Sequence, residues 1–530
     1  MVKAPSSKIR WAIFIAVALL ALAIRLPQLD VRPMHTDEAV NAFITGNALA
    51  GEMFHYDPQD RHGPVLYLVA KPIAQLGGAK NFSELTETQL RLTPVIIGSA
   101  MILLFGAAVE MFGFIPCLVA ALLFAFAPLP VYYSRYFIHE TLFVAATFGL
   151  ILSAWWVGSR CEPTRRRTQR QGTESSVSEN LAVPPDAYSA GKICRRATNS
   201  TIFAALAGLC AALMLACKET AVIHFFALAI AALAGWWVSR RSSEVRAAVA
   251  PSAKIISIAV AVFIAATILL FTSFGQNWSA LADLFHAVAR FTARAGGEGH
   301  AKPLGYYFQI LDPLFIFFLV AVAGIFAAIS DAVIGTRKAS LPLLVYALLT
   351  FGIYSAIPYK QPWLALNLWL PIALLCGLGV EAIWQQITNA TSRWIFAVAA
   401  AALLVTTLQQ TKVFVFDKPA DEKNPFAYAH TTEDVLGLPG KISELAAAKK
   451  LAAPRIAVVA ADAWPLPWYL RKFPNTGFWQ PGQETGVADF LITMTDVPAN
   501  LTNRLENFRP EFFGVRPNVL VILWTPEAKP

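Results

Sequence analysis

The chain has 530 residues, of which 56% are hydrophobic and only 15% are charged. These proportions exclude an ordinary soluble domain and are typical of a protein that crosses a membrane many times. The net charge of +9 does not indicate nucleic-acid binding, because the basic residues stand in short loops between apolar runs rather than on one soluble face.

The first apolar run covers residues 11–29 and follows the bases Lys3, Lys8 and Arg10. Because no small-residue cleavage site follows it, we expect a retained membrane helix whose N-terminus lies in the cytoplasm. Residues 65–76 are apolar but short for a span, which favours an interfacial or partly inserted segment. Ten longer runs lie at residues 92–112, 115–132, 138–157, 199–217, 220–238, 255–275, 306–330, 341–357, 363–384 and 394–410. Each can cross a hydrocarbon core of about 30 Å, so the sequence predicts about eleven transmembrane helices.

The segment between the first run and residue 67 is far more polar than its flanks. It carries two adjacent acids, Asp37 and Glu38, and ends in His62-Gly63-Pro64. Two carboxylates beside a membrane are costly to place unless water, a metal or a substrate meets them. On a helix they point about 100° apart, so one would react while the other orients it or caps the helix. The alternative is that Thr36 or Asp37 only caps a helix over residues 38–49.

The loops at 158–198, 239–254 and 337–338 are rich in Lys and Arg, which places them in the cytoplasm. Other polar groups then fall outside: residues 132–136 with His139 and Glu140, Lys218 with Glu219, residues 274–302, and residues 359–361. They gather on the face of the acidic loop, which favours chemistry on a lipid headgroup. There Arg135, Lys218 and Lys360 would supply cations for a phosphate. The alternatives are a local Lys218–Glu219 ion pair and an ordinary helix start at residues 139–140.

The tail from residue 411 to residue 530 holds 13 basic and 13 acidic residues and is therefore neutral. A helix is expected at 442–451 and buried strands at 455–461, 488–494 and 518–524, which predicts a small α/β domain outside the membrane. The aromatic residues at 464–471 serve either packing or a surface that faces sugar or membrane. The six cysteines show no zinc or redox spacing.

The order Pro33-x-x-x-Asp37-Glu38, a long outer loop and His62-Gly63-Pro64-x-x-Tyr67 resembles the GT-C glycosyltransferases. It looks most like the branch that contains the protein O-mannosyltransferases and the lipid A aminoarabinose transferase. Asp37 and His62 match that branch's first acidic motif and its Lys/His-Pro-Pro-type motif, with Gly63 in place of the first proline. Residues 134–140 are similar to its second acidic motif, with Glu140 where Asp is more usual. Residues 359–363 and 464–471 look like a subgroup of flippase-activity-associated proteins.

The resemblance implies a polytopic α-helical membrane protein of GT-C type. Residues 1–410 would form the transmembrane domain, residues 30–67 its catalytic outer loop, and residues 411–530 a small α/β domain. The protein would lie in the plasma (inner) membrane with its C-terminal domain extracytoplasmic. The implied activity is transfer of a sugar from a polyprenyl-phosphate-linked donor to a protein or glycolipid acceptor, with inversion and with Asp37 as general base.

The implied catalytic residues are Asp37, Glu38 and Glu140, and the implied substrate-binding residues are His62, Tyr67, Arg135, His139, Lys218, Glu219, Tyr359 and Lys360. No cofactor is required, although a divalent metal, Mg or Mn, at Asp37 and Glu140 is compatible with the family. Two other functions stay open: a polyprenyl-lipid flippase or non-enzymatic accessory subunit, and a sensor whose tail binds glycan.

Overall fold

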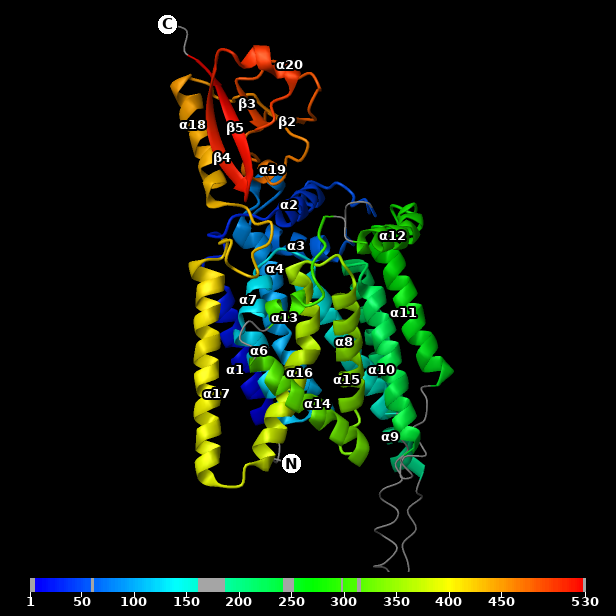
Figure 1. Ribbon diagram of the computed structural model, residues 1–530. Helices are drawn as coiled ribbons and strands as arrows, with labels where there is room; N and C mark the ends of the chain where they lie inside the picture. Colours follow the sequence, from blue (N-terminus) through cyan, green and yellow to red (C-terminus); the bar gives the residue numbers. More distant parts are fainter. Residues whose placement is uncertain are drawn as a thin grey trace, which may run out of the picture.

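The computed structural model describes residues 5–58, 62–160, 186–241, 252–296, 299–311 and 316–527. Most of the basic loop at 158–198, and residues 59–61 of the acidic loop, lie outside the described residues. Long helices form a bundle, and a small sheet with its helices sits on one end of it (Figure 1). The N-terminus lies at the opposite end of the bundle (Figure 1).

Among the described residues, nine helices are long and apolar enough to cross a membrane. They are α1 (Ser7–Arg25), α4 and α5 taken together (Glu87–Ala100 and Ile102–Phe112), α8 (Glu140–Arg160), α9 (Asp186–Cys217), α10 (Ala221–Arg241), α11 (Ala253–Phe271), α14 (Ile316–Ile334), α16 (Ala365–Gln386) and α17 (Ala390–Thr411). Two other predicted spans coincide with shorter apolar helices, α6 (Phe114–Phe126) and α15 (Ser340–Ala356). Where the structure describes them, the predicted runs are therefore largely helical, and nine reach the length of a span when α4 and α5 are counted as one. The protein is an integral membrane protein.

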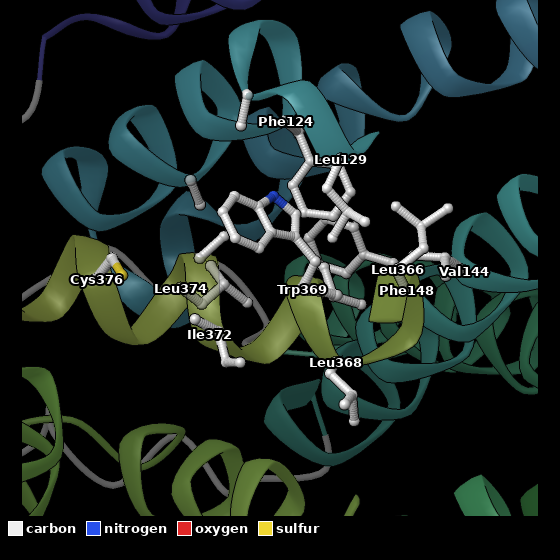
Figure 2. Close-up of a cluster of buried hydrophobic side chains, with 14 of the residues drawn as sticks. Phe124, Leu129, Val144, Phe148, Leu366, Leu368, Trp369, Ile372, Leu374 and Cys376 are labelled. Carbon is white, nitrogen blue, oxygen red and sulfur yellow. The ribbon is translucent and has the colours of Figure 1, made fainter. Parts of the chain in front are cut away.

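Helix α16 lies at the centre of the bundle, and its residues from Ala365 to Gly379 are all buried. Its Trp369 lies among Phe124 of α6, Leu129 of α7 (Pro128–Tyr133) and Phe148 of α8 (Figure 2). Gly379 of α16 faces the backbone carbonyl of Val320 in α14 so closely that a Cβ would collide with it. Small residues of this kind allow helices to pack tightly where lipid removes the hydrophobic drive between them.

A layer of shorter helices covers the end of the bundle beneath the sheet (Figure 1). It contains α2 (Thr36–Leu49) and α3 (Val65–Leu76), whereas α12 (Ala280–Ala295) lies to one side above α11, and α13 (Tyr306–Leu311) lies lower, at about the level of α7 (Figure 1). Helix α2 and the start of α3 thus make up about half of the described part of the predicted acidic loop. Helix α2 starts at Thr36, two residues before the predicted start, and ends at Leu49 as predicted, so the acidic pair lies in its first turn.

The sheet has five strands in the order β2-β1-β3-β5-β4. Strand β1 (Ile456–Val459) pairs in parallel with β2 (Thr476–Trp479) and β3 (Phe490–Met494), and β5 (Val519–Pro526) runs antiparallel to β3 and β4 (Phe508–Arg516). The helices of this region are α18 (Gly437–Ala448), α19 (Leu466–Tyr469) and α20 (Ala499–Thr502). The three predicted strands are confirmed as β1, β3 and β5. The edge strands β2 and β4 were missed, because almost none of their residues are buried, and Pro510 and the charged residues of β4 interrupt its apolar pattern.

The sheet region is fastened to the bundle by hydrogen bonds and apolar packing. Tyr469 accepts a hydrogen bond from the Met34 N–H at 2.8 Å, and the Trp468 indole donates to Glu87 at 2.8 Å. Leu85 and Leu90 of the bundle end share one buried cluster with Trp468. The connecting residues 412–430 also pack downward, since Tyr132 donates to the Pro419 carbonyl oxygen at 2.7 Å. The underside of the sheet region is therefore held in place above α2.

Candidate functional site

A cavity of about 660 Å³ lies between the outer helix ends and the sheet region. Its walls come from α2, residues 62–67, the start of α8, the turn between α9 and α10, α12, and residues 354–364. Eight of the predicted site residues line it: Asp37, His62, Tyr67, His139, Glu140, Lys218, Glu219 and Tyr359. The structure thus brings together side chains from four separate polar stretches. Glu38, Arg135 and Lys360 are not among the lining residues.

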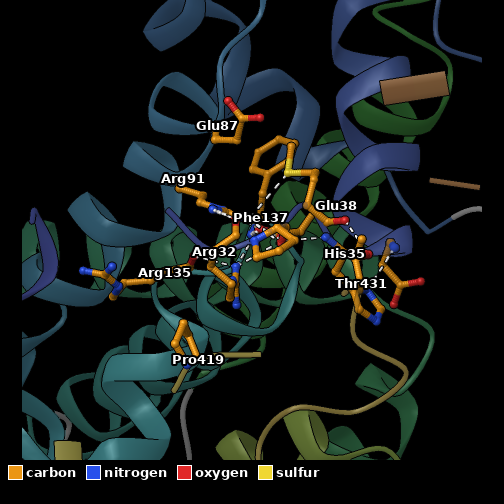
Figure 3. A network of polar contacts seen from close by, with 12 residues as sticks. Arg32, His35, Glu38, Glu87, Arg91, Arg135, Phe137, Pro419 and Thr431 are labelled. Carbon is orange, nitrogen blue, oxygen red and sulfur yellow. Dashed lines mark hydrogen bonds and ion pairs between the residues drawn. The ribbon is translucent and has the colours of Figure 1, made fainter. Parts of the chain in front are cut away.

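Glu38, in the first turn of α2, is fully buried and binds two arginines (Figure 3). Arg32 and Arg91 approach its carboxylate at 3.0 and 2.8 Å. The carboxylate also accepts a hydrogen bond from the Phe137 N–H at 2.9 Å. Burial raises the pKa of Glu38, but the charges of Arg32 and Arg91 and the Phe137 hydrogen bond outweigh it and lower this pKa to about 2. Glu38 therefore joins α2, α4 and the segment before α8, and does not face the cavity.

Helix α2 is capped by His35 and not by Thr36 or Asp37, so that alternative is wrong. The His35 Nδ1 accepts from the Asp37 N–H at 3.1 Å, and Glu38 accepts from the His35 N–H at 3.2 Å, which completes a capping box. The other ring nitrogen lies 3.1 Å from the Tyr428 carbonyl oxygen. A neutral imidazole with its proton on Nε2 satisfies both contacts. The side chain of Asp37 is thereby left without a capping role.

Asp37 differs from the other acidic residues that line the cavity. No described residue forms a hydrogen bond or ion pair with its carboxylate in the structure. Glu140, by contrast, is bound by Lys218, and Glu219 by His62. The predicted local Lys218–Glu219 pair is wrong, because the ammonium reaches across to the start of α8. Among the described residues that line the cavity, Asp37 is thus the carboxylate without a bound partner, since Asp462 is paired with Arg516.

His62, Glu219 and Tyr56 form a second polar group on the cavity wall. His62 Nδ1 lies 2.9 Å from one Glu219 oxygen, and the Tyr56 hydroxyl donates to the other at 3.0 Å. Burial raises the pKa of Glu219, but its contacts with His62 and Tyr56 outweigh this effect and lower the pKa to about 2. Glu219 therefore stays ionised and holds His62 at the cavity.

Gly63 explains the departure of this chain from a Pro-Pro motif. A Cβ at Gly63 would collide with the backbone of Ala216 at the end of α9. Only glycine allows this approach, which also lets the Gly63 carbonyl oxygen meet the His139 ring at 3.2 Å. Burial, followed by the neighbouring His62 and Lys218, holds the pKa of His139 well below its usual value of 6.5. His139 is therefore neutral at pH 7 and is not a cation for a phosphate.

The placement of Arg135 and Lys360 at the phosphate is wrong. Arg135 donates to the carbonyl oxygens of Arg25, Pro27 and Gln28 at 2.8, 2.6 and 3.0 Å. These carbonyls end α1 and have no helical partner, so a cation there satisfies them. Lys360 donates to the carbonyl oxygens of Ile357 and Lys302 at 2.6 and 3.2 Å. Both side chains fasten backbone segments rather than face the cavity.

The residues present do not fit a divalent metal between Asp37 and Glu140. Lys218 occupies the Glu140 carboxylate, so an ion would have to displace an ammonium group. No cluster of three or more His, Cys, Asp or Glu side chains suited to a metal occurs within the described ranges. We therefore assign no step to a metal.

Several lining residues were not predicted. Arg290 of α12 adds a base to the wall, and Asp462, Trp464 and Arg516 come from the sheet region. Arg290 belongs to the outer stretch 274–302, and Trp464 to the aromatic stretch whose role was left open, so the sequence held a signal for both. Asp462 and Arg516 carry no local pattern, since only the fold brings them to the cavity.

No model of a protein family matches the sequence, and no curated protein matches it. Solved structures match in fold. The ArnT structure from Cupriavidus metallidurans, bound to undecaprenyl phosphate, has a TM-score of 0.57 at 14% identity over 97% of both chains. The oligosaccharyltransferase AglB of Archaeoglobus fulgidus, in complex with an inhibitory peptide and a dolichol-phosphate, has a TM-score of 0.54 at 12% identity, over 98% of this chain and 76% of AglB.

A second structure of the Archaeoglobus fulgidus oligosaccharyltransferase, tethered with an acceptor peptide, has a TM-score of 0.56 at 13% identity over 89% of this chain. The match covers 64% of that protein, which is less than two thirds of its length. Identities this low do not distinguish the branch named above, which stays a prediction. The likeness shows that the chain shares the fold of these proteins, which agrees with the GT-C type of fold predicted from the sequence.

Proposed function

We propose that the protein is a membrane glycosyltransferase that uses a polyprenyl-phosphate-linked sugar, with Asp37 as its general base. The observation that carries this proposal is the Asp37 carboxylate, which lines the cavity without a partner among the described residues while its acidic neighbours there are paired. ArnT bound to undecaprenyl phosphate and AglB in complex with a dolichol-phosphate have the same fold, which supports a lipid-phosphate donor.

In this reaction Asp37 takes the proton from an acceptor hydroxyl, whose oxygen forms a bond to the anomeric carbon of the sugar. The bond from that carbon to the phosphate oxygen breaks, and polyprenyl phosphate leaves from the opposite face, so the configuration inverts. General-base help of this kind is worth about 10²–10⁴ in rate. Asp37 then returns its proton to solvent.

Lys218 stabilises the departing phosphate. Glu140 accepts a hydrogen bond from one of the three ammonium N–H groups of Lys218 and fixes the side chain at the cavity wall. The remaining donors are suited to phosphate oxygens, and a positioned cation at a dry site is worth several kcal/mol, roughly the effect of an oxyanion-hole donor. His62, held by Glu219, and Arg290 line the same cavity and add to this basic wall.

The test compares Asp37→Asn with Glu52→Gln, an exposed neutralisation just after α2. Asn keeps the shape of Asp but cannot take a proton, so sugar transfer from a polyprenyl-phosphate donor should fall at least about 10²-fold, while donor binding stays the same. Glu52→Gln should transfer like the wild type. Near-wild-type transfer by Asp37→Asn would remove the proposed base and favour a lipid carrier.

A further inference from the structure

The cavity has two chemically different surfaces. The surface formed by the outer helix ends and α12 is ionic: it holds the bases Lys218, His62 and Arg290, which are suited to an anion, beside the acids Asp37, Glu140 and Glu219. The opposite surface is supplied by the sheet region through Ala461, Asp462, Trp464 and Arg516. We call Asp462, Trp464 and Arg516 the roof of the cavity.

The roof residues are organised around one carboxylate. Asp462 accepts a hydrogen bond from Arg516 at 2.9 Å and from the Trp464 N–H at 3.2 Å. Asp462 and Trp464 follow the carboxyl end of β1, and Arg516 ends β4. The Trp464 ring also meets the Phe43 ring of α2 edge-on, with centroids 6.0 Å apart. The indole is thus fixed between the two parts of the molecule.

The roof offers hydrogen bonds in both directions without a net charge. The Asp462 side chain is 53% exposed and can still accept hydrogen bonds, while the Arg516 side chain is 20% exposed and contacts Asp462 through Nη2, which leaves other guanidinium N–H groups to donate. A phosphate at the roof would meet the charge of Asp462, and an amine would meet that of Arg516. A neutral, hydroxyl-rich ring can use both groups and can pack its C–H face on an aromatic side chain.

We propose that the roof is a saccharide subsite and that the acceptor presents a neutral sugar ring there. The name acceptor rests on the function proposed above, but binding at the roof does not. The roof is firmly placed for this task, because Tyr469 and Thr431 hold Met34 at 2.8 and 2.7 Å, just before α2 and Asp37. A sugar on the roof would thus enter the cavity that Asp37 lines.

The experiment uses the full chain in a detergent without sugar and detects binding by saturation-transfer NMR. The probes are methyl α-mannoside, methyl β-glucoside, methyl β-galactoside and N-acetylglucosamine. At least one should receive saturation from the wild type. Trp464→Ala and Arg516→Gln should each weaken that binding at least about tenfold, as expected when an aromatic or arginine anchor is lost.

Phe512→Ala is the matched control, because Phe512 is a 58% exposed aromatic on β4 that does not line the cavity. It should bind the sugar like the wild type. If Trp464→Ala does not fold, Arg516→Gln alone decides. Absence of saturation with all four sugars, or unchanged binding in the folded roof variants, would overturn the subsite. Saturation of a serine-containing hexapeptide in place of the sugars would assign the roof to a peptide.

The experiment distinguishes a failure of the saccharide subsite from a failure of the proposed function. Sugar binding is measured without donor or turnover, so it stands even if no transfer occurs. Conversely, transfer that depends on Asp37 stands even if the roof binds no sugar. When both hold, the roof variants should raise KM for the acceptor and leave KM for the lipid-phosphate donor unchanged.

Discussion

Asp37 and Glu38 show how two neighbouring carboxylates acquire different roles from the geometry of one helix. Helix α2 turns them about 100° apart, so that Asp37 lines the cavity while Glu38 points to Arg32 and Arg91. Removing one partner of a buried, paired charge leaves the others without compensation and costs about 3–5 kcal/mol. The catalytic role predicted for Glu38 is therefore replaced, in our proposal, by a positioning role for the Asp37 segment.

This arrangement predicts a loss of stability in acid. The pKa values of Glu38 and Glu219 lie at about 2 in the folded protein and at 4.5 in the absence of these contacts. Both therefore stabilise the fold fully above pH 4.5, and this stabilisation is lost as the pH falls toward 2. Thermal unfolding of the wild type in detergent should shift to lower temperature across that range.

Glu38→Gln should lower the unfolding temperature at pH 7 and make its acid dependence shallower, because one of the two groups no longer titrates. Glu110→Gln, an exposed change on α5, should behave like the wild type at both pH values. Equal slopes for wild type and Glu38→Gln would contradict the assigned pairing.

At the scale of elements, the contact between residues 62–64 and the end of α9 sets the shape of the cavity wall. Gly63→Ala should push this segment away, because the obstacle is the Ala216 backbone, which cannot rotate aside. The His139–Gly63 and His62–Glu219 contacts should weaken, and sugar transfer should fall at least about tenfold, as expected when a wall residue is displaced by about 1 Å. Gly158→Ala in α8 meets open space and is the control for a glycine change in this protein. Equal transfer by both variants would show that the close approach is not required.

The sequence predicted most elements because their signals are local. The length of the apolar runs identified the helices. The basic loops indicated which helix ends lie on the same side, and the polar residues at those ends include eight residues of the cavity. The sequence pattern did not show that Arg135 and Lys360 donate their hydrogen bonds to backbone carbonyl oxygens. It also did not show the cap of α2, because a histidine at this position has no helical signature. Two of the three roof residues, Asp462 and Arg516, were inaccessible to local reasoning, since they reach the cavity only through the sheet order.

At the scale of the whole molecule, the bundle has the sheet region at one end and the N-terminus at the other (Figure 1). We propose that the N-terminal end is cytoplasmic. Lys8 and Arg10 stand at the start of the first helix, and Arg337 and Lys338 stand between two later helices. Basic residues at helix ends concentrate on the cytoplasmic side of a membrane. Alkaline phosphatase fused after Ser83 or Asp434 should then be active, and fused after Thr173 inactive. Activity at residue 173 would invert the placement of the cavity.

The fastening of the sheet region to Met34 has a consequence for the order of synthesis. The hydrogen bond between Met34 and Tyr469 joins residues 435 positions apart. At about 5–20 residues per second, the ribosome needs roughly 20 to 90 s to cover that distance. During this time the apolar surface around Met34, Leu85 and Leu90 waits for the side chains that will cover it. The cavity is therefore closed by a region that is made after the bundle, and a product that terminates before the sheet region has one wall of the site and no roof.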